Sequence, residues 1–267
     1  FVDDAGNVSP KGISPNDVDQ GKLGDCYVLS SLAAVATQNP ELIRNMIRAN
    51  PDGTYTVTFK KQNSFGVWYD FPVTVDGKLP VELTYLDAFQ EGIDKGLGKP
   101  NWDYSKKVPY AQAGDFAGDK PELWVAIVEK AYAKQGGGYD IIGRGGFTAN
   151  ALPMITGQRS IGHDPQEMSL HELAESFKNG SAITVETHQA WPSPLAQIDS
   201  TIGRGLFKKG VLVPSHAYYV VGVDEANGTV TVKNPWGWAK EPTQAIPYSE
   251  LQKHSQKIVT NDGARRK

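Results

Sequence analysis

The chain has 267 residues, of which 39% are hydrophobic and 21% charged, and 27 Lys and Arg residues stand against 30 Asp and Glu residues, for a net charge of -3. This length suffices for one large domain or two lobes with a sizeable core, and the weak net charge argues against nucleic acid or an anionic membrane surface as the main partner. No apolar run approaches the roughly 18 residues that a membrane helix needs, and a single cysteine excludes an internal disulfide framework.

The first half of the chain is predicted to contain helices and one pair of strands. Segment 26–37 carries apolar residues almost all round, which indicates a buried helix, and segment 40–48, with proline at its start, indicates a second short helix. Alternating apolar and polar residues predict antiparallel strands over 54–59 and 68–75. Segment 121–135 has Pro and Glu at its start and three glycines after it, so we expect a further helix there.

The second half is predicted to be richer in strands. Ser169 and Glu172 fit a capping box at the start of a helix that reaches Phe177. Residues 181–187 indicate a strand, and Asn227-Gly228 between two β-prone segments is a strong hairpin signal.

The change from helix-rich to strand-rich sequence predicts an α+β fold in two lobes. A glycine-rich stretch near residue 146 marks the expected boundary. The helical lobe would span residues 1–146 and the β-rich lobe residues 147–267. Because the chain begins at Phe1 rather than Met, we expect it to be a segment of a longer protein, from which a signal peptide could have been removed.

The only cysteine, Cys26, stands at the start of the predicted buried helix. Unpaired backbone N–H groups and the positive end of the helix dipole stabilise a thiolate at such a position. Gly24 would let a substrate backbone approach closely. Gln20 would bring a side-chain amide beside the sulfur, and one such donor to a developing oxyanion is worth about 3–4 kcal/mol in the transition state. Taken alone, the pattern also fits a small buried cysteine without chemistry.

A histidine and an asparagine on the predicted hairpin supply partners for this thiol. His216 opens one strand and Asn234 ends the other, so we expect a hydrogen bond between their side chains. Asn234 would orient the imidazole, and His216 would take the thiol proton and later protonate a leaving amine. Trp236 would cover that bond and exclude water.

Four segments of the chain resemble a known family. The sequences QGKLGDCYVLSSLA, PELWVAIVEKAYAKQGGGY, HAYYVVGV and KNPWG are similar to the protease core of the calpain family of papain-like cysteine proteases, over about residues 12–259. The second of these segments has no catalytic role, so its similarity to the family cannot be explained by convergent evolution of the same catalytic mechanism. The resemblance implies an endopeptidase that forms a thioester acyl-enzyme, with a cleft between a helical lobe and a β-rich lobe.

The resemblance also implies a role for individual residues. In the catalytic set, Cys26 would be the nucleophile, Gln20 the oxyanion donor and His216 the general acid and base. Asn234 would orient His216, and Trp236 would shield their hydrogen bond. The substrate-binding set would be Gly24, Gly145, Gly146 and Ser215. Two positions depart from the family, because Tyr27 stands where Trp usually follows the cysteine and Ser215 where Gly often precedes the histidine.

Calcium is a further implication of the resemblance, because the animal enzymes bind one ion in each lobe through carbonyl and carboxylate oxygens. In the helical lobe, Gly12 would offer a carbonyl, while Asp17 and Glu122 fall on the acidic positions. In the β-rich lobe the acidic loop is missing, and Glu241 is the only nearby carboxylate. We therefore expect one calcium ion and partial dependence on it. Asp17 and Glu122 fit equally well as a turn-capping residue and a first-turn helix acid.

Two other classes of function remain open. A catalytically silent peptide-binding module would keep the fold without turnover. A transglutaminase-like acyl transferase would use a similar Cys-His pair, but such enzymes typically orient the histidine with Asp rather than Asn. The expected partner is a protein or peptide substrate, with no nucleic acid, no membrane insertion and no organic cofactor, and regulatory domains would lie outside this segment. A single reduced cysteine favours the cytoplasm, with secretion as the alternative.

Overall fold

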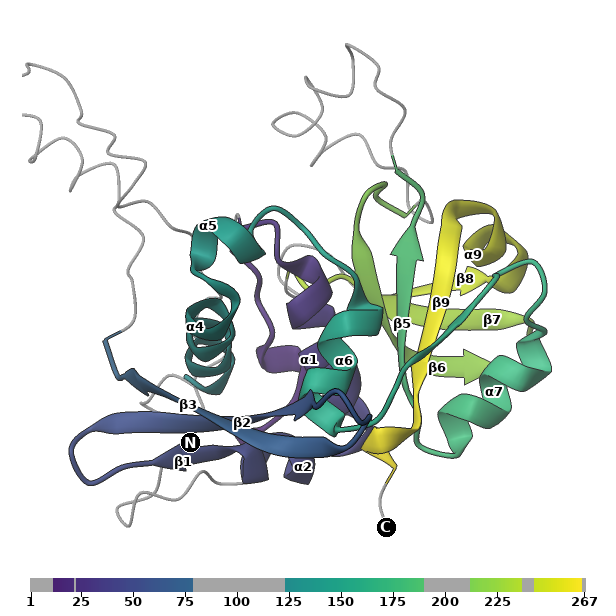
Figure 1. Ribbon diagram of the computed structural model, residues 1–267. Helices are drawn as coiled ribbons and strands as arrows, with labels where there is room; N and C mark the ends of the chain where they lie inside the picture. Colours follow the sequence, from purple (N-terminus) through teal and green to yellow (C-terminus); the bar gives the residue numbers. More distant parts are fainter. Residues whose placement is uncertain (1–11, 22, 79–122, 190–211, 237–242, 266–267) are drawn as a thin grey trace, which may run out of the picture.

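The computed structural model describes residues 12–21, 23–78, 123–189, 212–236 and 243–265 (Figure 1). The elements of the first half are a short 3-10 helix η2 (Pro15–Asp17), α1 (Cys26–Gln38), α2 (Pro40–Met46), β1 (Ile47–Ala49), β2 (Thr54–Gln62), β3 (Trp68–Asp76), α4 (Trp124–Gly136) and α5 (Tyr139–Ile142). Those of the second half are α6 (Thr148–Thr156), β4 (Ile161–His163), α7 (Leu170–Lys178), β5 (Ala182–Thr187), β6 (Ala217–Asp224), β7 (Thr229–Lys233), β8 (Gln244–Pro247), α9 (Tyr248–His254), β9 (Ser255–Asn261) and a 3-10 turn η4 (Asp262–Ala264).

The strands form two antiparallel sheets. The smaller has the order β1-β2-β3, and the larger has the order β4-β9-β5-β6-β7-β8. Helices α1 and α6 lie between the sheets, α4 lies beside the smaller sheet with α5 next to it on the side away from the sheet, and α7 and α9 lie beside the larger sheet (Figure 1). This arrangement confirms the predicted α+β class.

Helix α1 is the central element, and every residue from Tyr27 to Ala36 is buried. Its two buried serines are both hydrogen-bonded, as buried hydroxyls must be. Ser31 donates to the carbonyl of Tyr27 within the helix, whereas Ser30 donates over 2.8 Å to the carbonyl of Ala217 at the start of β6. The second bond ties the cysteine-bearing helix to the strand that follows His216.

The apolar side chains form two cores. The first joins α1, α2, α4 and the smaller sheet, and it also takes in Ala151, Leu152 and Ile155 of α6. The second lies between the larger sheet and its two flanking helices, with Leu173 and Leu251 among its fully buried members. The first core also takes in Ala182, Tyr219, Val259 and Ala264 from the second half of the chain, so the division into two lobes near residue 146 stays a prediction.

Most predicted elements are present, and several differ in extent by one to three residues. Helix α2 ends at Met46 because Ile47–Ala49 pair with β2 as a strand, so the helix predicted over 40–48 is two residues too long. The capping box of α7 is formed in both directions, Ser169 to Glu172 and back. The Asn-Gly hairpin joins β6 to β7, with Gly228 at a φ of +67°.

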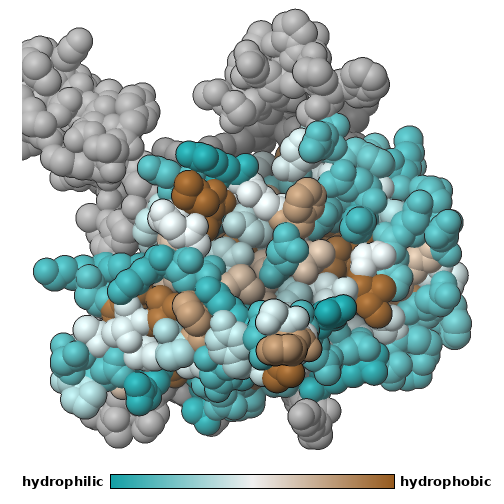
Figure 2. All heavy atoms as spheres, viewed as in Figure 1, coloured by the Kyte–Doolittle hydropathy of each residue, from teal (hydrophilic) through white to brown (hydrophobic). Residues whose placement is uncertain are grey.

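The surface carries scattered apolar side chains. On the face drawn in Figure 2 they form small, separate patches among hydrophilic residues. The most exposed is Phe65, in the turn between β2 and β3, at 89%. None of the helices described has the length and apolar character needed to cross a membrane.

Candidate active site

Cys26 is the first residue of α1, and its partly exposed thiol faces the start of β6. A hydrogen bond from the backbone N–H of Ala217 lowers the pKa of the thiol, but burial acts in the opposite direction and is the larger effect. The negative charge of Asp25 adds to burial, and the pKa of Cys26 rises to about 11. Burial therefore opposes the stabilisation of a thiolate that is expected from the helix N-terminus, and it favours the neutral thiol.

His216 immediately precedes β6 and is fixed by the neighbouring strand β5. Its backbone N–H donates to the hydroxyl of Thr187 over 2.9 Å, and its carbonyl accepts the Thr187 N–H over 2.9 Å. The side chain is 8% exposed. Burial lowers the pKa of His216 to about 4, against a smaller raising effect of its bond to Asn234, so the ring is neutral at neutral pH.

The predicted hydrogen bond between His216 and Asn234 is present, and it sets the tautomer of the ring. Nε2 of His216 lies 2.8 Å from Oδ1 of Asn234, and the backbone N–H of Trp236 donates to the same Oδ1 over 3.1 Å. Because an N–H donor requires an acceptor, that atom is the amide oxygen, and Nε2 carries the ring proton. The other nitrogen, Nδ1, is therefore left as a proton acceptor.

Trp236 lies beside this hydrogen bond, as predicted. Its ring centroid is 4.8 Å from that of His216, with the planes tilted by 43°. An indole at that distance excludes water from one side of the imidazole. Of the hydrogen bonds these side chains make within the described residues, none joins the sulfur of Cys26 to the ring of His216.

Ser215 adopts a left-handed backbone conformation next to His216. Its φ is +53°, the single positive value among the non-glycine residues described, and its N–H donates to the carbonyl of His188 over 2.8 Å. A side chain in this conformation costs roughly 1–2 kcal/mol relative to glycine. The strain explains why glycine suits this position in the family that the sequence resembles.

Gln20 is buried close to the active-site segment, but its amide is not directed at open space. Its backbone N–H donates to Pro235, and its Nε2 donates to the carbonyl of Leu23 over 2.5 Å and to Oδ1 of Asp25 over 3.2 Å. Its Oε1 is buried without a hydrogen-bond partner in the part of the chain described. In this conformation both amide hydrogens of Gln20 are therefore donated to neighbouring residues of the same segment.

Close packing explains two of the three glycines near Cys26, namely Gly24 and Gly146. A Cβ on Gly24 would overlap the carbonyl oxygen of Gly143, so internal packing accounts for this glycine. A Cβ on Gly146 would lie 2.7 Å from the ring of Tyr27, the residue that replaces the expected Trp. Gly145 has a φ of +92° with open space around its Cβ position, so a ligand backbone has room to approach there.

The predicted calcium ligands are only partly within the described residues. Asp17 is buried, and its Oδ2 accepts the N–H of Ser14 and the indole N–H of Trp124, each over 2.7 Å. Gly12 lies nearby in the chain, whereas Glu122 is outside the described residues, as is Glu241 of the β-rich lobe. One carboxylate and one carbonyl fall short of the six to eight oxygens that calcium takes, so this part alone does not form the site.

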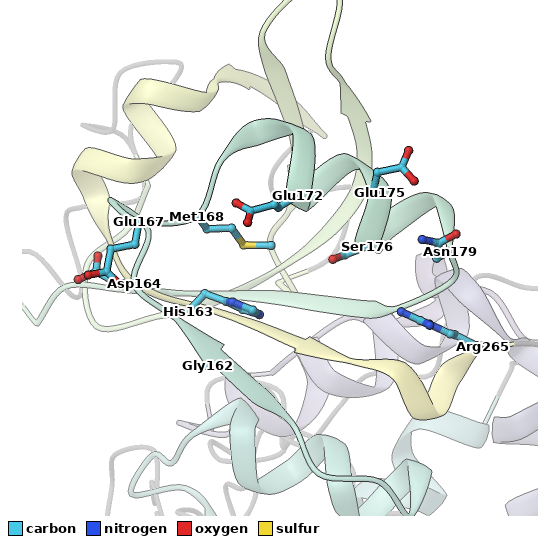
Figure 3. Close-up of a pocket in the computed structure, with 10 residues that line it drawn as sticks. All are labelled: Gly162, His163, Asp164, Glu167, Met168, Glu172, Glu175, Ser176, Asn179 and Arg265. Carbon is cyan, nitrogen blue, oxygen red and sulfur yellow. The ribbon is translucent and has the colours of Figure 1, made fainter.

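An acidic groove lies elsewhere in the second half of the chain. Figure 3 shows it between α7, which contributes Glu172 and Glu175, and the turn after β4, which contributes Asp164 and Glu167. No candidate catalytic residue lines it. Across the described ranges, no group of three His, Cys, Asp or Glu side chains is arranged to hold a metal ion.

Three buried acids near the thiol were missed by the sequence analysis. Asp25 and Glu129 are 0% exposed, and their side chains are hydrogen-bonded to each other. Glu186 is 5% exposed and accepts two hydrogen bonds from Thr148, at 2.7 and 2.8 Å, which joins β5 to α6. A signal was present for one of them, because Glu129 interrupts the apolar face of the helix predicted over 121–135.

Comparison with known proteins identifies the family of this chain. Residues 3–256 match the family described as calpain family cysteine protease. The chain is 30% identical over 264 residues to the calpain-type cysteine protease DEK1 of Arabidopsis thaliana, which covers 92% of this chain and 10% of that protein. It is 30% identical to calpain clp-4 of Caenorhabditis elegans (86% of this chain, 28% of that protein) and 27% identical to calpain-8 of Rattus norvegicus (85% and 28%). The chain thus spans about a tenth to a third of the length of these relatives.

Proposed function

The chain belongs to the calpain family of cysteine proteases, and we propose that it hydrolyses peptide bonds in protein substrates as a cysteine endopeptidase with Cys26 as its nucleophile. The hydrogen bond from His216 Nε2 to Asn234 Oδ1 carries this proposal. It leaves Nδ1 of a neutral imidazole as a base, at the start of the strand whose N–H faces the thiol. A neutral imidazole nitrogen beside the thiol is the general base by which a cysteine nucleophile loses its proton.

In the first half of the reaction, Nδ1 of His216 accepts the thiol proton and the sulfur of Cys26 attacks the carbonyl carbon. A C–S bond forms while the carbonyl π electrons move onto oxygen. The backbone N–H of Cys26, in the first turn of α1 where N–H groups lack intrahelical partners, donates to this oxyanion. The Gln20 amide joins it when the N–H that is donated to Leu23 in this conformation turns to the substrate. Asn234 stabilises the imidazolium by accepting from Nε2–H.

The tetrahedral adduct then collapses. The C–N bond breaks as the C=O re-forms, and His216 gives its Nδ1 proton to the leaving amine, which leaves a thioester on Cys26. Water attacks the thioester while His216 takes one of its protons. The C–S bond breaks, the carboxylic acid departs, and the sulfur recovers its proton from the imidazolium.

Casein cleavage tests this proposal. The wild-type chain should release peptides, and Cys26→Ala and Cys26→Ser should not, while both variants unfold at the same temperature as wild type. A Cys26 variant that still cleaved casein would remove the nucleophile assignment, because the chain has no other cysteine.

Calcium binding by the helical lobe is a separate proposal. We infer that one ion is held by the Gly12 carbonyl, Asp17 and Glu122, and that activity depends on it only in part. Asp17 supports this because Ser14 and Trp124 fix its carboxylate. Activity in excess chelator should be reduced but measurable relative to millimolar calcium, and Asp17→Asn should abolish the difference. An absolute requirement with two cooperating ions contradicts the proposal.

A catalytically silent peptide-binding module of the same fold is the second candidate. One observation favours it, namely that both N–H groups of Gln20 are donated to Leu23 and Asp25, so the oxyanion donor is engaged. A peptidyl epoxide discriminates the two functions. Selective, pH-dependent modification of Cys26 supports the enzyme, and an inert thiol at every pH supports the module.

A further inference from the structure

Two carboxyl groups lie fully buried behind the proposed nucleophile. Asp25 precedes Cys26 at the start of α1, Glu129 lies in the middle of α4, and both are 0% exposed. Their side chains are hydrogen-bonded to each other. Ionised carboxylates only accept hydrogen bonds, so this bond requires a proton on one of the two groups.

The contacts of Asp25 show where that proton belongs. Although Asp25 is the N-cap of α1, its side chain makes no capping hydrogen bond. Its Oδ1 accepts the amide N–H of Gln20, while its Oδ2 is buried and receives no donor from the residues described. One proton held between Oδ2 and Glu129 satisfies this oxygen, which would otherwise pay a full desolvation penalty.

We propose that Asp25 and Glu129 share a single proton and act as a positioning pair that holds the amide of Gln20 beside Cys26. With one proton, the pair presents a single negative charge to the N–H of Gln20. Without it, two adjacent carboxylates repel each other in a medium of low dielectric and push α1 and α4 apart at this point. The consequence for catalysis rests on the proposed function, whereas the shared proton does not.

The other titratable groups that face this region are distinguishable from the pair. On α1, burial raises the pKa of Cys26 to about 11 and also raises that of Tyr27. On α4, burial raises the pKa of Tyr132. On β5, the charge of Glu186 acts on the thiol, and before β6 the pKa of His216 is lowered to about 4. The thiol and the phenols therefore stay neutral between about pH 4 and 8, and the imidazole, which titrates near pH 4, contributes equally to wild type and to a Glu129 variant.

Two substitutions of Glu129 separate positioning from simple structural support. Glu129→Gln donates an amide hydrogen to Asp25 at every pH and so imitates the singly protonated pair. Glu129→Leu fills the space but leaves Oδ2 of Asp25 without a partner. We expect Glu129→Gln to keep kcat for a peptide substrate within about threefold of wild type, and Glu129→Leu to lower kcat by roughly tenfold or more with little change in KM, because an oxyanion donor acts in the transition state. Glu175→Gln, on the surface of α7, is the matched control.

Thermal unfolding at a series of pH values tests the shared proton without any assay of catalysis. The pKa of Asp25 is raised by burial, so the wild-type chain gains stability from the proton at low pH and loses it as pH rises through the folded pKa. Its Tm should fall relative to that of Glu129→Gln from about pH 4 to 6, between the unfolded and the folded pKa of Asp25, and the difference should be constant above about pH 7. The same fall in the variant, or a Glu129→Leu chain as active as the Glu175→Gln control, overturns the proposal. If no form cleaves peptides, the Tm comparison still decides whether the proton is shared.

Discussion

The reactivity of Cys26 towards iodoacetamide is the prediction that the structure determines most closely. A free thiol with its ordinary pKa of 9.0 is about one per cent thiolate at pH 7, since each unit between pH and pKa is a factor of ten. With the pKa raised to about 11, that fraction is about a hundredfold smaller. Because thiolate is the reacting species, the alkylation rate should be correspondingly low at pH 7 and should rise about tenfold per pH unit up to about pH 10.

The assay is the second-order rate constant of alkylation, followed by the mass of the modified chain from pH 5 to 10, with a cysteine peptide as reference. The neutral His216, whose pKa is lowered to about 4, provides no imidazolium to stabilise thiolate in this range. A rate that is already high at pH 5 and flat to pH 8 is the signature of a thiolate-imidazolium ion pair, and it would refute the neutral resting state.

Three further predictions concern the residues around the thiol. Burial lowers the pKa of His216 from 6.5 to about 4. The free energy of unfolding of wild type, measured relative to His216→Asn in urea titrations, should therefore rise by about 3 kcal/mol from pH 4 to 7. A difference that stays constant with pH contradicts the burial of His216 as a neutral ring. Asn234→Ala should lower kcat roughly 10–100-fold in a peptide cleavage assay, because the imidazole loses the acceptor of Nε2–H, and unchanged kcat contradicts the orienting role. Ser30→Ala should lower the Tm by about 2–5 °C, because a buried hydrogen bond to Ala217 worth about 1–2 kcal/mol is lost. An unaltered Tm means that this hydrogen bond does not stabilise the contact between α1 and β6.

The elements that carry the proposed chemistry were predictable because their signals are local. Apolar residues on every side of segment 26–37 indicate a helix buried on all faces, and α1 is such a helix. The Asn227-Gly228 turn fixes which strands are neighbours, and that pairing brings His216 within hydrogen-bonding distance of Asn234. The family followed from the motifs and is confirmed by the match over residues 3–256.

The properties that escaped prediction depend on tertiary burial. The helix N-terminus favours a thiolate at Cys26, but burial of the side chain acts in the opposite direction and is the larger effect. The direction of the Gln20 amide is set by Leu23 and Asp25, and spacing along the chain does not reveal which acceptor an amide will find. Strand β9 was also missed, because it enters the larger sheet between β4 and β5 through contacts distant in sequence.

The catalytic roles of Gln20, Trp236 and the glycines near the cleft stay predictions, since they concern a bound substrate. Gly145 is the best placed of these, with its positive φ and open Cβ position. Gly24 shows how a sequence motif can have two explanations, because contact with Gly143 already requires a glycine there.

Trapping the acyl-enzyme tests the central claim most directly. The chain is mixed with a peptide ester, quenched in acid during turnover and analysed by mass spectrometry after digestion. A gain equal to the acyl group on the peptide that carries Cys26, absent from Cys26→Ala, is the predicted result. Product release without any adduct, or an adduct on another residue, contradicts a thioester mechanism at this cysteine.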